Sequence, residues 1–175
     1  DVEEGPWPGG TFRSTMEAFR PAMTDLRAEG KGETAMVDMR LKKLAGILVN
    51  YSLKVQKGEK VLVQDNNVEA PFVRALVEAI HDAGGLPFVT LRDRTIDRAL
   101  FNRATEEQLE LQASFEVQRM KAMDCYIGFT SLRNQFAWAD MPPDALQRYN
   151  AIVNKKVHMD VRLPDTRWVV LRYPS

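Results

Sequence analysis

The sequence has few of the residues on which covalent and metal chemistry depend. Its 175 residues include one cysteine, Cys125, and two histidines, His81 and His158. A single cysteine can form neither an intrachain disulfide nor a cysteine-based zinc site. Because Cys125 lies in an apolar run, residues 125–129, we expect a buried and unreactive thiol rather than a nucleophile. The histidines are far apart in the sequence, so we expect neither to bind a metal within this chain.

An excess of one charge and long apolar runs are also absent. Twenty-four basic residues balance twenty-four acidic ones, and the resulting net charge of zero argues against a nucleic-acid partner. No run approaches the ~18 apolar residues of a membrane-spanning helix. Residues 1–15 lack the basic start and the apolar stretch of a signal peptide. We therefore expect a cytoplasmic protein that interacts with neither membranes nor nucleic acids.

Common catalytic and nucleotide-binding motifs are missing as well. There is no glycine-rich phosphate loop of either the Walker or the dinucleotide-binding type. The Gly-x-Ser-x-Gly sequence of many hydrolases and the His-Glu-x-x-His zinc motif are also absent. Hydrolytic and redox chemistry therefore have no obvious catalytic residues within this chain.

The first 35 residues differ from the rest in composition. They contain five of the ten glycines and three of the nine prolines. A helical pattern from Met16 to Leu26 is interrupted by Pro21. We predict a loose or partly helical extension over residues 1–35 and an α/β domain over residues 36–175.

From Met36 onward, helical and strand patterns alternate. Helices are predicted over residues 39–52, from Pro71 to the glycine pair at 84–85, over residues 96–123 with a break near 104–105, and over residues 142–157. Short apolar strands are predicted over residues 61–63, 86–91, 126–129 and 168–171. Strands that alternate with helices form parallel sheets through right-handed crossovers. We therefore predict a three-layer α/β fold with a Rossmann-like parallel sheet flanked by helices, without a nucleotide-binding motif.

Two polar segments that follow predicted strands are candidate binding positions, because ligands of open α/β sheets bind beyond the carboxyl ends of the strands. The first is the loop after the first strand, Gln64 to Asn67, in which Asp65, Asn66 and Asn67 are the candidate residues. The second follows the third strand and contains Thr130, Ser131, Arg133 and Asn134. A turn or helix cap is the simpler interpretation of both segments, since these residue types suit turns on their own account. Trp138 and Trp168 are interpreted as packing residues.

Three segments resemble the amino-terminal domain of the thermophilic metalloaminopeptidases, those of the aminopeptidase T or leucyl aminopeptidase type. Residues 43–55, KLAGILVNYSLKV, followed by KGEKV at 57–61, resemble the opening of that domain. Residues 70–87 resemble its next helix and strand, and RWVVLRYPS at 167–175 resembles the segment that closes it. The order and spacing of the three segments make the resemblance specific, and it covers residues 36–175.

The resemblance implies a dimeric exopeptidase that removes amino-terminal residues from peptides with two divalent metal ions, Zn, Co or Mn. In such sites a metal-bound water attacks the peptide carbonyl group. In the family, the Glu, His and Asp ligands come from a carboxy-terminal domain, so no catalytic or metal-binding residue carries over to this sequence. We therefore expect this chain to be a scaffold domain that binds no metal and is inactive alone, and we expect the coding frame to continue past Ser175.

Two other functions remain open at the level of sequence. The chain could be a stand-alone α/β binding or interaction module that has lost the peptidase chemistry. A weaker alternative is a related metal-dependent ring-cleaving dioxygenase. Only the metal ligands of the carboxy-terminal domain could distinguish this function from that of a peptidase.

Overall fold

The structure is a computed structural model, and it describes residues 39–66, 70–131 and 138–173. The predicted extension over residues 1–35, with its interrupted helix, lies outside the described residues. None of the described helices is long and apolar enough to cross a membrane.

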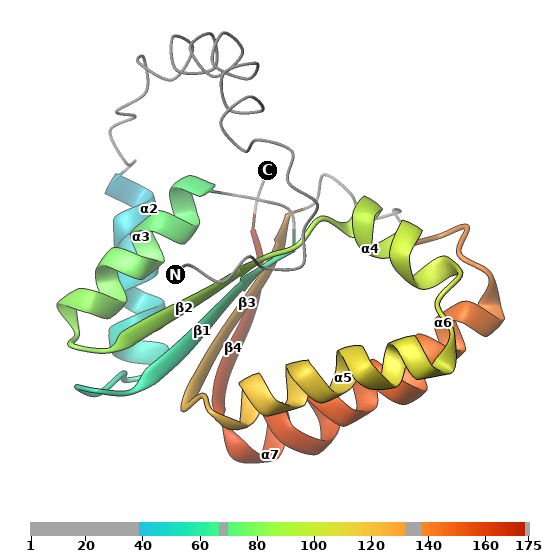
Figure 1. Cartoon of the computed structure of the whole chain (residues 1–175). Coiled ribbons are helices and arrows are strands. Elements are labelled where there is room, and N and C mark those ends of the chain that lie inside the picture. Colours follow the sequence, from blue (N-terminus) through green and yellow to red (C-terminus); the bar gives the residue numbers. More distant parts are fainter. Residues whose placement is uncertain (1–38, 67–69, 132–137, 174–175) are drawn as a thin grey trace, which may run out of the picture. The chain divides into compact units, whose positions relative to one another are not determined.

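The described chain alternates between helices and strands (Figure 1). The strands are β1 Lys60–Asp65, β2 Leu86–Leu91, β3 Cys125–Ser131 and β4 Arg167–Tyr173. The α-helices are α2 Met39–Gly46, α3 Ala70–Asp82, α4 Arg94–Asn102, α5 Glu106–Lys121, α6 Pro143–Tyr149 and α7 Leu163–Asp165. Two π-helical segments, η1 Ile47–Ser52 and η3 Asn150–Arg162, continue α2 and α6.

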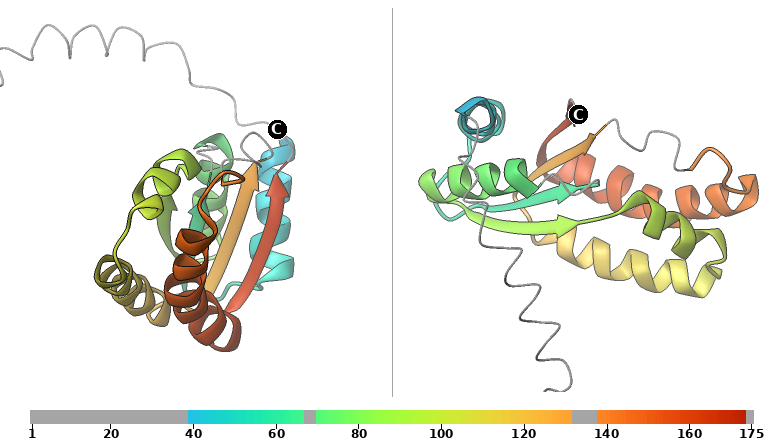
Figure 2. Two further views of the ribbon diagram at one scale, coloured as in Figure 1. Left: turned by 90° about the vertical axis from the view of Figure 1, so that its right-hand side faces the viewer. Right: turned by 90° about the horizontal axis from the view of Figure 1, so that it is seen from above.

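The four strands form one all-parallel sheet in the order β2-β1-β3-β4. The chain therefore moves one way from β1 to β2 and the opposite way from β2 to β3 and β4. Right-handed crossovers in opposite directions place their helices on opposite faces of a sheet. Accordingly, α2 and α3 lie on one face, and α4, α5, α6 and η3 lie on the other (Figures 1 and 2). The predicted three-layer α/β fold is confirmed.

Most of the predicted elements are confirmed, with differences at their ends. The predicted break near 104–105 separates α4 from α5, and the Thr105 hydroxyl accepts a hydrogen bond from the Gln108 amide, 3.2 Å away. Helix α4 begins at Arg94, two residues earlier than the predicted start at residue 96, because the Asp93 carboxylate caps it. The last helix was predicted to end near Val157 but continues to Asp165, because Val161 extends its buried face by another turn.

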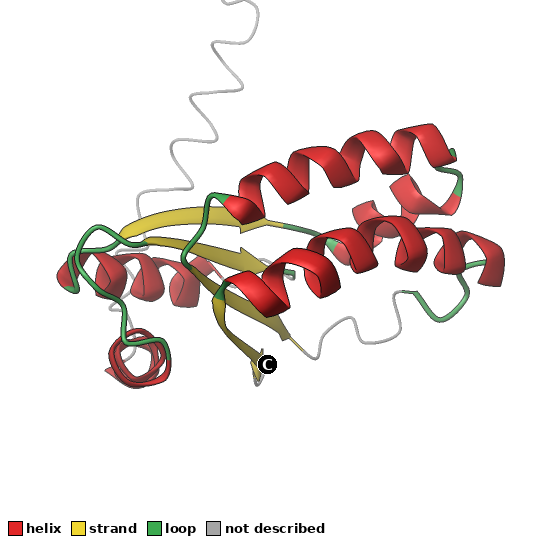
Figure 3. Ribbon diagram, turned by 90° about the horizontal axis from the view of Figure 1, so that it is seen from below, coloured by secondary structure: helices red, strands yellow, loops and turns green. Residues whose placement is uncertain are grey.

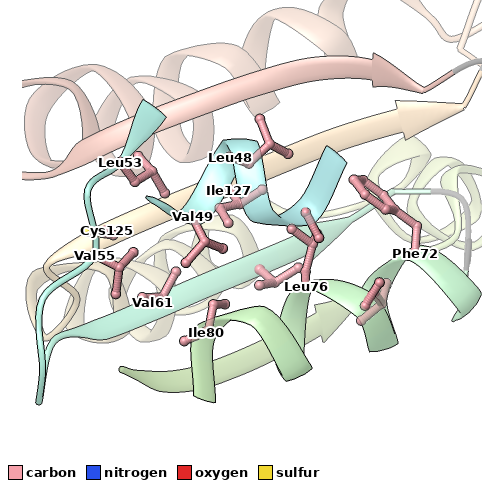
Figure 4. Close-up of a cluster of buried hydrophobic side chains, with 14 of the residues drawn as sticks. Leu48, Val49, Leu53, Val55, Val61, Phe72, Leu76, Ile80, Cys125 and Ile127 are labelled. Carbon is pink, nitrogen blue, oxygen red and sulfur yellow. The ribbon is translucent and has the colours of Figure 1, made fainter. Parts of the chain in front are cut away.

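The core on the α2 and α3 face is built from aliphatic side chains of both layers (Figure 4). Val61 and Ile127 of the sheet meet Leu76 and Ile80 of α3 there, all four fully buried. Cys125 lies in the same core with no exposed surface, as predicted. Burial raises the pKa of its thiol, against the opposing charge of Arg167.

The core on the opposite face is built around α5 and η3, which lie side by side (Figure 3). Val153, Val157 and Val161 form a buried row along η3, and Leu109 and Met120 contribute from α5. This core stops short of the carboxyl edge of the sheet, where polar side chains take the place of the aliphatic ones.

Gly85, between α3 and β2, is required by close packing. A Cβ atom added there would lie 2.9 Å from Ile80 Cγ2 and 2.9 Å from Val55 Cγ1, both in the buried core. Gly46, by contrast, has helical dihedral angles, and a Cβ atom there would meet no atom nearer than Asn50 Nδ2 at 3.9 Å.

We expect Gly85→Ala to lower the free energy of unfolding by about 1–3 kcal/mol, since overpacking a core has this cost. Gly46→Ala is the matched control and should leave stability unchanged or raise it by up to ~1 kcal/mol through higher helix propensity. Urea denaturation followed by circular dichroism measures both. Equal stabilities for the two variants would contradict the packing assigned to Gly85.

Candidate functional site

A cavity lined by convergent polar side chains lies at the carboxyl edge of the sheet. Its volume is about 250 Å³. It lies where β1 and β3 end side by side, at the point where the order of strands reverses, which is the usual ligand position in open α/β sheets. The cavity is lined by Gln64, Asn66, Arg92, Arg94, Asp97, Tyr126, Gly128, Phe129, Thr130, Trp138, Tyr149, Asn154, His158, Arg162 and Val170.

The structure places the predicted polar loop residues on two sides of the sheet. Gln64 and Asn66 line the cavity, and the Gln64 amide donates to Asn66 Oδ1 at 3.3 Å. Asp65 alternates with them along the strand and is fully buried on the α3 face. Asn67 lies outside the described residues. That this loop binds a ligand stays a prediction.

The predicted segment after β3 contributes one described side chain to the cavity, that of Thr130. Arg133, Asn134 and the side chain of Ser131 lie outside the described part of the chain. The end of β3 is joined to the loop after β1, because the backbone and side-chain amides of Asn66 both donate to the Phe129 carbonyl oxygen, at 3.2 and 3.4 Å.

The segment that follows β2 supplies two arginines. The Arg92 amide donates to the Asp65 carbonyl oxygen at 2.7 Å, which continues the sheet by one residue. The Arg92 side chain pairs with Asp97, with Nε and Oδ2 3.0 Å apart, and both side chains are mostly buried. Arg94 begins α4, whose first free amides, those of Thr95 and Ile96, already donate to the Asp93 carboxylate.

Aromatic rings form one wall of the cavity and position the arginines. Trp138 Nε1 donates to the Arg94 carbonyl oxygen at 3.1 Å, and the Arg94 guanidinium lies 5.6 Å from the centre of the Trp138 ring. The ring of Tyr149 packs edge-on against Trp138, with centroids 5.1 Å apart. Trp138 is therefore a packing residue, as predicted, and also part of the cavity.

Gly128 shapes the floor of the cavity through the close approach of Tyr126. A Cβ atom at Gly128 would lie 2.7 Å from the Cε1 and Oη atoms of Tyr126. The absent side chain thus leaves room for the Tyr126 ring, and the Arg162 guanidinium lies 4.9 Å from the centre of that ring. Burial raises the pKa of the Tyr126 phenol, although the charge of Arg162 opposes the shift.

The segment η3 presents a polar row to the cavity beside its buried valine row. Asn154, His158 and Arg162 are spaced four residues apart, and all three line the cavity. His158 Nδ1 is buried without a hydrogen-bond partner among the described residues. Burial, helped by the charges of Arg162 and Arg92, lowers the pKa of His158 to about 4. His158 is therefore a neutral imidazole at pH 7.

Sequence reasoning missed most of these residues. Arg92 and Arg94 directly follow a predicted strand, so the rule that singled out Asp65 and Thr130 could also have found them. His158 and Arg162 carried no such signal, because they reach the cavity only through the packing of η3 against the sheet.

The cavity does not fit a divalent cation. Its described wall offers one carboxylate, that of Asp97, and one imidazole, that of His158, beside three guanidinium groups. Oxygen- and nitrogen-bound metals need a cluster of such ligands without competing positive charge. Across residues 39–66, 70–131 and 138–173, no group of three or more His, Cys, Asp or Glu residues is placed to hold a metal ion.

The lowered pKa of His158 predicts a specific dependence of stability on pH. Its pKa is lower in the folded chain, about 4, than its ordinary value of 6.5. Its contribution to stability is therefore complete above pH 6.5 and is lost as the pH falls toward 4. Between pH 7 and 5, we expect the wild type to lose about 1–2 kcal/mol more than His158→Gln.

His81, exposed in the last turn of α3, provides the matched control. His81→Gln should lose as much stability as the wild type between pH 7 and 5, measured by urea denaturation in a buffer of chloride salts. Parallel pH profiles for the wild type and His158→Gln would show that His158 is not buried as a neutral group.

Comparison with known proteins gives a family for this chain. The sequence model of the thermophilic metalloprotease (M29) family matches residues 37–175. No curated protein matches the sequence. Among solved structures, wild-type AmpT from Thermus thermophilus is similar at a TM-score of 0.60 and 20% identity, over 76% of this chain. This chain spans 35% of the length of that protein.

A second solved structure is that of a putative transcription regulation repressor of the LacI family from Corynebacterium glutamicum. The alignment covers 75% of this chain and 59% of the repressor chain. Its TM-score of 0.32 and its identity of 12% are too low to carry an argument. The similarity to AmpT shows a shared fold, and the match over residues 37–175 places this chain in the thermophilic metalloprotease family M29.

Proposed function

We propose that this chain is the amino-terminal scaffold domain of a metal-dependent aminopeptidase that releases amino-terminal residues from peptides. The single observation that carries the proposal is the family match over residues 37–175. The fold shared with AmpT, of whose length this chain spans 35%, agrees with a role as one part of a larger enzyme.

In this proposal, two divalent metal ions, Zn, Co or Mn, are bound by the complete enzyme outside this chain. The described residues support a metal site outside this chain, because the polar cavity is lined by three arginines and one carboxylate, a poor set of metal ligands. The chain would supply structural support and part of the substrate enclosure, and peptides would be the substrates.

We further propose a cytoplasmic homodimer. The outer strand β2 offers apolar surface for association, since Leu86, Phe88, Val89 and Leu91 are each more than two-fifths exposed. Exposed apolar surface of this kind favours burial against another chain or domain.

One observation favours a second candidate function, a binding module without peptidase chemistry. The cavity at the carboxyl edge of the sheet lies where α/β domains bind ligands, and polar side chains of β1, β3, α4, α6 and η3 converge on it. This function requires no metal and no further domain.

The peptidase proposal is tested by comparing the 175-residue chain with the product of its whole coding frame. Leucyl p-nitroanilide is the substrate, with Co²⁺, Zn²⁺ or Mn²⁺ added, and N-acetyl-leucyl p-nitroanilide is the matched control without a free amine. We expect no turnover by the 175-residue chain. We expect the whole product to cleave only the free-amine substrate, and to lose this activity with EDTA.

Metal-dependent turnover by the 175-residue chain would contradict the scaffold role. A whole product that cleaves neither substrate with any of the three metals would contradict the peptidase function and leave the binding module as the better description.

A further inference from the structure

The cavity at the carboxyl edge of the sheet holds more positive charge than the described residues of its wall neutralise. Three arginines, Arg92, Arg94 and Arg162, line it, and Asp97 is the one carboxylate in its described wall. Asp97 is committed to Arg92, with hydrogen bonds and an ion pair of 3.0–3.4 Å. In the described part of the chain, no carboxylate pairs with Arg94 or Arg162.

Arg94 and Arg162, which have no carboxylate partner in the described structure, are held in place and partly removed from water. The Nε atoms of Arg94 and Arg162 are buried without a hydrogen-bond partner among the described residues. Arg94 packs over Trp138, and Arg162 lies between the rings of Tyr126 and Trp168, 4.9 and 5.7 Å from their centres. Aromatic rings orient a guanidinium group but only partly offset the cost of desolvating its charge.

Neutral polar groups complete the wall. The neutral imidazole of His158 lines the cavity, and its Nδ1 atom has no hydrogen-bond partner in the described structure. Asn154 and Thr130 add uncharged donors from η3 and β3. At the amino-terminus of α4, the amides of Thr95 and Ile96 are already used, since they donate to the Asp93 side chain.

We propose that this cavity is a binding site for a small oxyanion, a carboxylate or a phosphate group, bound by the guanidinium groups of Arg94 and Arg162. Guanidinium groups match the paired oxygens of both anions in geometry and charge. A volume of about 250 Å³ lies just below the 300–1,000 Å³ common for drug-sized ligands, so the ligand is small. The site is independent of the peptidase function, because it needs no metal.

The test uses the 175-residue chain, with inorganic phosphate and acetate as probes at constant ionic strength in chloride. The imidazole signals of His158 and His81 are followed by NMR. We expect phosphate, acetate or both to bind saturably and to raise the pKa of His158 in proportion to occupancy, while His81 stays unchanged. The tighter of the two probes identifies the anion as a phosphate or a carboxylate.

Three variants separate a specific site from general attraction of anions. Arg94→Gln and Arg162→Lys should each weaken binding about tenfold or more, the latter because lysine keeps the charge and loses the planar fork. Arg103→Gln removes the same charge from an exposed position at the end of α4 and should bind like the wild type.

Any of three results would overturn the proposal. The first is the absence of a saturable change at His158 in the wild type, and the second is equal affinities for the Arg94→Gln, Arg162→Lys and Arg103→Gln variants. The third is a pKa of His158 at or above 6.5 in chloride alone, which would show that a carboxylate of the chain itself already occupies the cavity.

Discussion

The parallel ladder between β1 and β3 is the constraint on which the rest of the structure depends. It joins strands that are far apart in the sequence, with Leu62 opposite Tyr126 and Asp65 opposite Phe129. Because β2 lies on the other side of β1, the chain must reverse its direction across the sheet at this ladder. The reversal sends α3 to one face and α5 and η3 to the other. It also leaves the carboxyl ends of β1 and β3 uncovered by either crossover, and the cavity lies there.

The two faces of the sheet are stabilised by different means. The α3 face is mostly aliphatic, with the thiol of Cys125 and the rings of Phe72 and Phe129 in its core and the buried Asp65 at the end of β1. The opposite face is aliphatic near α5 but changes to arginine and aromatic rings toward the carboxyl edge. Desolvated guanidinium groups cost free energy unless they are paired, and rings such as Trp138 and Tyr126 offset part of that cost. An aliphatic core would be the more stable choice at this position, and the anion proposed above would supply the counter-charge that the described wall lacks.

Most of the fold could be predicted from local patterns. The apolar runs at 61–63 and 126–129 identified the strands β1 and β3, whose apolar composition reflects that both faces of each are covered. Thr105 and the glycine pair at 84–85 marked boundaries through their own backbone and capping chemistry. The predicted end of the last helix, near Val157, was wrong. Val161 continues the buried row of η3, but this row is buried only because η3 packs against α5. For the site, strand ends located Asn66 and Thr130, which line the cavity.

The sequence by itself determined the order of helices and strands, the parallel sheet and the resemblance to metalloaminopeptidases, because each of these follows from residues close together in the chain. Tertiary structure decided which side chains share a cavity. Arg94, Tyr126 and Arg162 are separated by more than thirty positions each and meet through the packing of α4, β3 and η3 around one edge of the sheet. The alternation of a strand likewise sent Asp65 to one face and Gln64 to the other. Local patterns carry no information about such contacts, since these depend on how separate elements are oriented in space.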